Sequence, residues 1–123
     1  MALVMEDMGV SVNGRDVVKG ASLTVDPGKV TAVLGANGAG KSELVMAIAG
    51  MLPIVRGSIV VDGRPIHNCT PDAVRLAGVA AVPEGHRVLT RLSVDDNLRV
   101  AGSMLSVADL GHTMAETYGL FPE

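Results

Sequence analysis

Eight consecutive residues combine glycines, a lysine and a serine at a spacing that suits phosphate chemistry. Residues 35–42 read Gly-Ala-Asn-Gly-Ala-Gly-Lys-Ser and fit the pattern G-x-x-x-x-G-K-[ST]. Glycines let a loop curl tightly and let backbone N–H groups approach phosphate oxygens closely. Lys41 would reach the β- and γ-phosphates as a point charge, and the Ser42 hydroxyl stands at the offset of a Mg²⁺ ligand. The pattern therefore predicts a nucleoside triphosphate site.

The elements on both sides of this phosphate loop are those that such a site needs. Residues 30–34 are a continuous apolar run and predict a buried strand, while apolar residues recur at helical spacing over 41–51 and predict a helix. That helix would direct its free N–H groups and the positive end of its dipole at the β-phosphate. This context argues against the alternative, an accidental glycine-rich turn.

The rest of the chain predicts an antiparallel β region and several short helices, and hence an α/β fold. About residues 1–29 are rich in β-branched residues and contain a strong hairpin signal at Asn13-Gly14, and about residues 57–66 hold another strand with a turn at Asp62-Gly63. The remaining predicted elements are a helix that begins after Thr70-Pro71, a strand over 79–82, a helix over about 94–101 that is capped by Ser93, and a helix from Ser106 to about Tyr118.

Composition excludes several classes of protein. The net charge of -3 and an aromatic content of 2% argue against a nucleic-acid partner. The apolar stretch 44–55 is only 12 residues long, well short of the roughly 20 that a membrane-spanning helix needs. Acidic residues near the N-terminus and the single Cys69 are typical of a cytoplasmic protein.

The phosphate loop and four further segments together resemble the ATP-binding subunit of an ABC transporter, most of all the branched-chain amino-acid uptake type. These segments are Gly-Ala-Ser-Leu at 20–23, Asp-Pro-Gly-Lys-Val at 26–30, Val-Pro-Glu-Gly at 82–85 and Leu-Ser-Val-Asp-Asp-Asn-Leu at 92–98. The resemblance covers essentially all 123 residues, but only the N-terminal portion of one nucleotide-binding domain of that family.

The resemblance implies a partial P-loop NTPase core with an N-terminal antiparallel β region. Its parts would be the β-rich region at about 1–29 and 57–66, the phosphate-loop strand and helix at 30–51, and a segment at 79–123 that resembles the family's Q-loop and the start of its helical region. The implied cofactors are ATP and Mg²⁺. The residues implied to hold the nucleotide are Gly35, Asn37, Gly38, Ala39, Gly40, Lys41, Ser42 and Glu43.

The implied metal contacts are Ser42 and Glu84, the latter where the family's glutamine stands. A carboxylate binds Mg²⁺ directly or through water, so Glu84 is compatible with that role; the alternative is a loop carboxylate without a ligand. The implied partners are transmembrane permease subunits and a second ATP-binding subunit. The implied location is cytoplasmic, on the inner face of the plasma membrane.

Two further positions depart from the family pattern. Val12 stands where an aromatic residue of the family stacks on adenine, so base binding should be weaker, unless Val12 is only a strand residue that faces the core. Glu43 stands where the family has Thr or Ser. Its carboxylate would repel the α-phosphate unless it turns to solvent, where it would also complement the helix N-terminus.

Parts that the family needs for hydrolysis do not occur in these 123 residues: an LSGGQ-like signature, an apolar strand that ends in Asp-Glu, and a later switch histidine. The chain alone is therefore expected to bind nucleotide weakly and to hydrolyse it hardly at all. The function expected is the ATP-binding portion of an import ATPase. The alternatives are a non-catalytic nucleotide-binding or scaffold fragment and, less favoured because 29 residues precede the phosphate-loop strand, a small kinase or GTPase.

Overall fold

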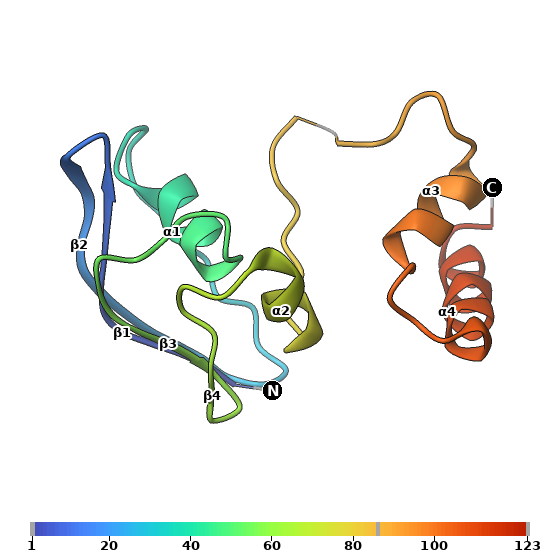
Figure 1. Cartoon of the computed structure of the whole chain (residues 1–123), viewed down its shortest axis with the longest axis horizontal. Helices are drawn as coiled ribbons and strands as arrows, with labels where there is room; N and C mark the ends of the chain where they lie inside the picture. Colours follow the sequence, from blue (N-terminus) through green and yellow to red (C-terminus); the bar gives the residue numbers. More distant parts are fainter. Residues whose placement is uncertain (1, 86, 123) are drawn as a thin grey trace. The chain divides into compact units, whose positions relative to one another are not determined.

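The structure is a computed structural model that describes residues 2–85 and 87–122. The chain divides into two compact units, Met1–Val82 and Pro83–Glu123, which we call the sheet unit and the helical unit. Together they form the α/β architecture that the sequence predicts (Figure 1).

The sheet unit is built on a four-stranded antiparallel sheet in the order β2-β1-β3-β4 (Figure 1). Its strands are β1 (Leu3–Val12), β2 (Arg15–Val25), β3 (Arg56–Val61) and β4 (Arg64–Pro65). Both predicted hairpin turns are confirmed. Asn13 and Gly14 have φ values of 50° and 74°, and Asp62 and Gly63 have 46° and 76°. Positive φ at both central residues is the geometry that matches the right-handed twist of paired strands.

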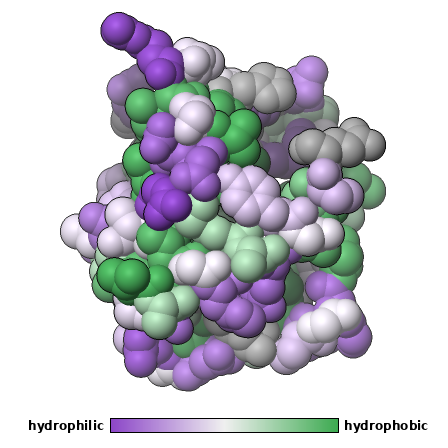
Figure 2. Space-filling view, turned by 90° about the vertical axis from the view of Figure 1, so that its right-hand side faces the viewer, coloured by the Kyte–Doolittle hydropathy of each residue, from purple (hydrophilic) through white to green (hydrophobic). Residues whose placement is uncertain are grey.

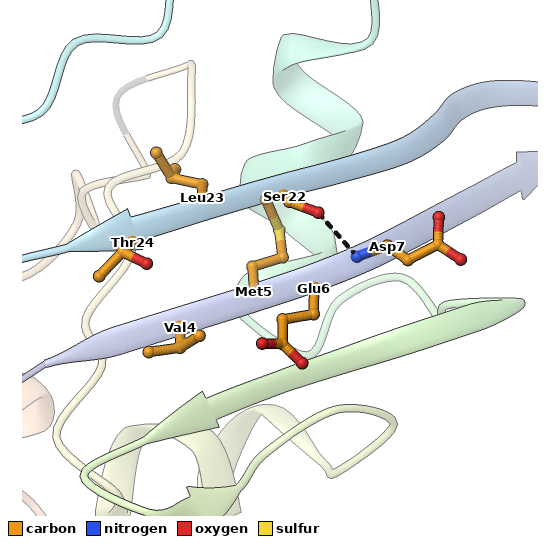
Figure 3. Close-up of a pocket in the computed structure, with 7 residues that line it drawn as sticks. All are labelled: Val4, Met5, Glu6, Asp7, Ser22, Leu23 and Thr24. Atoms are coloured by element: carbon orange, nitrogen blue, oxygen red, sulfur yellow. Dashed lines mark hydrogen bonds between the residues drawn. The ribbon is translucent and has the colours of Figure 1, made fainter.

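A β-bulge interrupts β1 at Glu6 and Asp7. These two residues stand opposite the single residue Ser22, between the Met5–Leu23 and Met8–Ala21 pairs. Asp7 adopts φ 43°, and its backbone N–H donates to the Ser22 hydroxyl oxygen at 3.0 Å (Figure 3). The bulge thus replaces a ladder hydrogen bond with a bond to a side chain, so the kink leaves no orphan donor at this point.

The hydrophobic core of the sheet unit lies between the sheet and the helices α1 (Lys41–Ile48) and α2 (Pro71–Leu76). The strands contribute the fully buried side chains Met5, Met8, Val10, Ile59 and Val61. Leu44 and Ala47 of α1 and Val74 of α2 complete the same cluster. Burial of this apolar surface holds α1, and hence the loop before it, against the sheet.

Two predicted strands are absent. Residues 30–34 and 79–82 pair with no strand in the described part of the chain, and Val30, Leu34 and Val82 are 99%, 89% and 95% exposed. A continuous apolar run forms a strand only where neighbours cover both faces and satisfy both edges. All the described strands belong to the antiparallel sheet, so neither segment has a partner.

The predicted helix over 41–51 is also too long, because α1 ends at Ile48. Gly50 adopts φ 75°, and the N–H of Met51 bonds back to the carbonyl of Met46. A left-handed glycine with this 6→1 bond is the usual way to stop a helix. The sequence contained this signal at Gly50, but the apolar spacing that continues to Met51 concealed it.

The helical unit contains α3 (Val94–Ala101) and α4 (Val107–Leu120). The predicted cap at Ser93 is confirmed, since its side chain accepts a hydrogen bond from the N–H group of Asp96, and Ser106 caps α4 in the same way through the N–H group of Asp109. Within the described residues of this unit only Met114 is a buried apolar side chain, and several others remain at the surface (Figure 2). No helix in the described ranges is long and apolar enough to span a membrane.

Candidate phosphate-binding site

The phosphate loop, residues 35–40, curls through two left-handed glycines. Gly38 and Gly40 have φ values of 80° and 93°, and the N–H of Ala39 closes a turn on the carbonyl of Ala36 at 3.1 Å. Around Gly38 there is open space, so only its φ demands glycine there. At Gly40 a side chain would collide with the carbonyl oxygen of Val17 in β2, so glycine lets the loop rest directly on that strand.

The N-terminus of α1 lacks a side-chain cap. Its first position is preceded by Gly40, whereas a Thr or Ser side chain caps each of the other described helices. The first turn of a helix leaves N–H groups without partners in the helix, and the helix dipole makes that end positive. The end of the phosphate loop therefore offers free donors and positive potential together, which favours an anion.

Lys41 folds back over the loop that precedes it. Its ammonium group donates to the carbonyl oxygens of Gly35 and Ala36 at 2.6 and 2.7 Å. A lysine has three donors, so one remains for another acceptor. Because loop carbonyls are neutral, a phosphate oxygen would compete well for this ammonium through a charge-assisted bond.

Three other residues predicted to hold the nucleotide or the metal lie close to Lys41 in the sequence. Asn37 and Ser42 are exposed, and the Ser42 hydroxyl has no hydrogen-bond partner among the described residues. Glu43 is partly buried in the first turn of α1, and its carboxylate makes no ion pair with a described residue. A carboxylate at this position complements the helix dipole. Whether it also repels a phosphate stays a prediction.

Val12 and Glu84, two positions that depart from the family pattern, differ in burial. Val12 is partly buried and packs against the hydrophobic core, in agreement with its interpretation as a strand residue that faces the core. Glu84 is exposed and belongs to the helical unit, so its pairing with Ser42 at a Mg²⁺ ion stays a prediction. Within residues 2–85 and 87–122 no three His, Cys, Asp or Glu side chains gather into a ready-made metal cluster.

Sequence reasoning missed the organising role of Asn97. Its side-chain amide donates to the carbonyls of Leu89 and Ser93 at 3.0 and 2.9 Å, and its oxygen accepts from the N–H of Leu89 at 2.9 Å. This side chain thereby ties the loop after Glu84 to the start of α3. The sequence signal was an asparagine in the first turn of a helix that follows a loop. The backbone N–H and carbonyl groups of a loop need hydrogen-bond partners, and an asparagine side chain supplies both a donor and an acceptor.

A family model and individual related proteins all point to one family. A family model described as ABC transporter matches residues 18–120. The chain is 36% identical over 101 residues to the high-affinity branched-chain amino acid transport ATP-binding protein BraG of Pseudomonas aeruginosa, covering 82% of this chain and 43% of that protein. It is 37% identical over 119 residues to the fructose import ATP-binding protein FruK of Bifidobacterium longum, covering 96% of this chain and 21% of that protein.

Solved structures agree on the fold. A nucleotide-free ATP-binding cassette from an ABC transporter superposes with a TM-score of 0.76 and 26% identity, covering 89% of this chain and 45% of that one. An ATP-binding cassette of an ABC transporter in its ADP conformation gives a TM-score of 0.75 and 26% identity, covering 92% and 46%. The chain spans less than half the length of the curated relatives described above. From the family model matched over most of its residues, the chain belongs to the ABC transporter family.

Proposed function

We propose that this chain is the ATP-binding portion of an ABC importer ATPase that powers solute uptake. One observation carries the proposal. The uncapped N-terminus of α1 directly follows the phosphate loop, and the ammonium group of Lys41 donates to two carbonyl oxygens of that loop. These features provide free N–H donors, positive potential and a movable ammonium at one place.

The residues present fit a nucleoside triphosphate. The backbone N–H groups of Gly35, Asn37, Gly38, Ala39 and Gly40 are proposed to line the phosphates, and Lys41 to exchange its carbonyl partners for β- and γ-phosphate oxygens. The exposed Ser42 hydroxyl would serve Mg²⁺ from the sheet unit, with Glu84 as a second contact and Glu43 beside the α-phosphate. Bound Mg²⁺ would neutralise phosphate charge.

ATP turnover is not proposed for this chain alone. Transfer of a phosphoryl group to water depends on a positioned water and on stabilisation of charge by several groups. The 123 residues contain no apolar strand followed by Asp-Glu and no LSGGQ-like segment. We propose that a second ATP-binding subunit and transmembrane permease subunits complete the assembly on the cytoplasmic face of a membrane.

Branched-chain amino acids are the proposed solute. This finer assignment is supported by the Val-Pro-Glu-Gly segment at 82–85 and by the relative whose name states branched-chain amino-acid transport. Other relatives at similar identity carry names that state fructose import or lipopolysaccharide export. Uptake of labelled leucine and of labelled fructose by cells that lack the gene would distinguish these solutes.

A non-catalytic scaffold is the second candidate, and one observation favours it. Residues 30–34 are exposed and pair with no described strand, so no strand supports the phosphate loop on its N-terminal side. A loop supported on one side loses more conformational entropy when it binds a ligand. A scaffold would show no stabilisation by Mg-ATP, whereas a nucleotide-binding portion would gain thermal stability as Mg-ATP is added.

The decisive experiment is Lys41→Ala, measured by isothermal titration of Mg-ATP at moderate salt. We expect binding to be lost, because Lys41 is the side-chain cation that hydrogen-bonds the phosphate loop among the described residues. Lys29→Ala is the matched control: Lys29 is an exposed lysine that pairs with Asp26 at 2.9 Å and should leave affinity unchanged. Equal affinity of the wild-type and Lys41→Ala chains, with similar circular dichroism, would overturn the phosphate-loop assignment.

A further inference from the structure

A cavity of about 560 Å³ opens beside the phosphate loop within the sheet unit. Its walls are Arg15, Asp16, Val17 and Lys19 of β2 together with Gly38 and Ala39 of the loop. Lys41 and Ser42, which would hold the terminal phosphates and the metal, do not line it. The cavity therefore adjoins the loop without including the two residues proposed to hold the phosphates and the metal, and it is available to the sugar and base of a nucleotide.

A second β-bulge fixes how β2 meets this cavity. Ser11 pairs with Asp16 and Val10 pairs with Val18, which leaves Val17 as the extra residue. The carbonyl of Val17 is the group against which Gly40 rests, so the bulge is the point of contact between strand and loop. Bulges commonly re-aim side chains next to binding sites. Arg15 is two residues from Val17 and is the first residue of β2, and the β1–β2 turn lies near the phosphate loop (Figure 1).

The sheet unit has no Phe, Tyr or Trp side chain to stack on a base, and its one histidine, His67, does not line the cavity. The only Tyr and the only Phe of the chain are Tyr118 and Phe121, which lie in the helical unit, and there is no Trp. Val12, the cross-strand partner of Arg15, packs against the core. A base in the cavity would thus depend on another flat group for stacking.

Arg15 has the chemistry for this task. Its side chain is exposed and forms no hydrogen bond or ion pair with any described residue. A guanidinium is planar and weakly hydrated, and it stacks on nucleobases as aromatic rings do. An unpartnered guanidinium also loses no existing bond when it moves onto a ligand.

We propose that Arg15 holds the nucleotide by stacking its guanidinium on the base, and that it thereby replaces a stacking aromatic residue in this site. The inference rests on the proposed function, since it requires a nucleotide on the phosphate loop. Arg15 is a specificity-determining residue in this assignment: it contacts the base and leaves the phosphates to Lys41.

The test compares two ligands on the full chain, Mg-ATP and Mg-tripolyphosphate, by isothermal titration. Arg15→Ala should weaken Mg-ATP binding about tenfold and leave Mg-tripolyphosphate binding unchanged, because tripolyphosphate has no base. Arg15→Tyr should restore Mg-ATP binding, since an aromatic ring keeps the stacking and removes the charge. Arg15→Lys should not restore it, since an ammonium keeps the charge and removes the flat surface.

Arg64→Ala is the matched control. Arg64 is exposed, follows the Asp62-Gly63 turn as Arg15 follows Asn13-Gly14, and pairs with Val61 as Arg15 pairs with Val12. It does not line the cavity and should change neither affinity.

Each other outcome overturns the inference in an identifiable way. If Arg15→Ala weakens both ligands and Arg15→Lys restores both, Arg15 is a phosphate contact. If the wild-type chain binds Mg-ATP and Arg15→Ala binds it equally well, the base is held elsewhere while the proposed function stands. If the wild-type chain binds neither ligand, the proposed function fails and this inference fails with it.

Discussion

The two units of this chain are stabilised in different ways. Twelve of the thirteen buried apolar side chains among the described residues belong to the sheet unit, and the helical unit has only Met114. The helical unit relies on polar contacts close in sequence: Ser93 and Ser106 cap its helices, and Asn97 ties a loop to α3. The sheet unit therefore depends on distant residues that bury each other, whereas the helical unit depends on local hydrogen bonds.

This contrast bears on the candidate site, because every residue of the phosphate loop belongs to the unit with the core. Leu44 and Ala47 anchor α1 in that core, so the uncapped N–H groups are presented from a fixed base. Glu84 belongs to the unit held by local contacts. Such contacts open at low free energy, so we expect the segment that carries Glu84 to adjust more readily than the phosphate loop.

The largest expected effect is in the sheet core. Ile59→Ala removes a side chain that is fully buried and pairs across the sheet with Met5. We expect the free energy of unfolding of the sheet unit to fall by about 2–5 kcal/mol, as is usual when a buried isoleucine is truncated. Val30→Ala is the control: Val30 is 99% exposed, so its truncation should change stability by no more than about 0.5 kcal/mol.

The single tyrosine makes this experiment specific to each unit. Tyr118 is the only Tyr, there is no Trp, and it lies in α4, so its fluorescence reports on the helical unit alone. Urea titrations should show Ile59→Ala shifting the circular-dichroism transition while the tyrosine transition stays in place. Coincident shifts of both transitions would mean that the two units unfold together and are not stabilised independently.

A smaller effect is expected from a helix cap. Ser93→Ala removes the oxygen that accepts from the N–H of Asp96 at 3.1 Å. Loss of a serine cap costs about 1 kcal/mol, so the tyrosine transition should shift to lower urea while the sheet unit is unaffected. Ser103→Ala, at an exposed serine whose side chain has no hydrogen-bond partner in the described ranges, should leave the transition in place. An unchanged Ser93→Ala chain would show that α3 does not depend on its cap.

Local signals in the sequence predicted local structure well. Asn13-Gly14 and Asp62-Gly63 form the hairpins expected, and Ser93 and Ser106 cap the helices expected, because each signal acts through residues one to three positions away. The segment 30–34 failed because strand formation also needs a partner, and apolar composition does not say whether one is available. Propensity describes a residue's fit to a sheet, not the presence of that sheet.

In the candidate site, too, the sequence predicted local features and missed those that depend on distant residues. The order of residues in 35–42 predicted the tightly curled loop, since its left-handed glycines act on neighbouring positions, while the reach of Lys41 to a phosphate stays a prediction. The cavity beside Arg15 was not predictable, because it arises from a bulge at Val17 and from contact between that bulge and Gly40. A bulge depends on the register between two strands, and a register shift of one residue leaves no distinct mark in either strand alone.

The smallest expected effect concerns a contact between the two helices of the helical unit. The Tyr118 hydroxyl donates to one carboxylate oxygen of Asp95 at 3.0 Å, and Arg99 pairs with the other at 2.6 Å. Partial burial raises the pKa of Tyr118 above its ordinary 10.0, and the hydrogen bond to Asp95 with its negative charge raises this pKa further. The hydrogen bond from Arg99, followed by that from Tyr118, lowers the pKa of Asp95 below 3.8.

The signs of these shifts fix the pH range of the contact. A raised pKa at Tyr118 gives stability that is complete below pH 10 and is lost as pH rises through the pKa of the folded state. A lowered pKa at Asp95 gives stability that is present above pH 3.8 and is lost as pH falls through the folded-state pKa. The α3–α4 contact should therefore hold across the neutral range and weaken at both extremes.

Asp95→Asn tests the contact through the tyrosine itself. The amide oxygen still accepts the hydroxyl hydrogen, but the negative charge is gone, so the Tyr118 pKa should fall toward its ordinary value without reaching it, because the partial burial remains. Spectrophotometric titration of the single tyrosine measures this directly. Asp96→Asn is the matched control: the Asp96 carboxylate accepts from the Ser93 hydroxyl at 2.7 Å and makes no hydrogen bond with Tyr118, so the tyrosine titration should not move. A Tyr118 pKa that is the same in Asp95→Asn and in the wild-type chain would show that α3 and α4 are joined by packing rather than by this charged contact, and that the helical unit depends less on polar bonds than the comparison with the sheet unit implies.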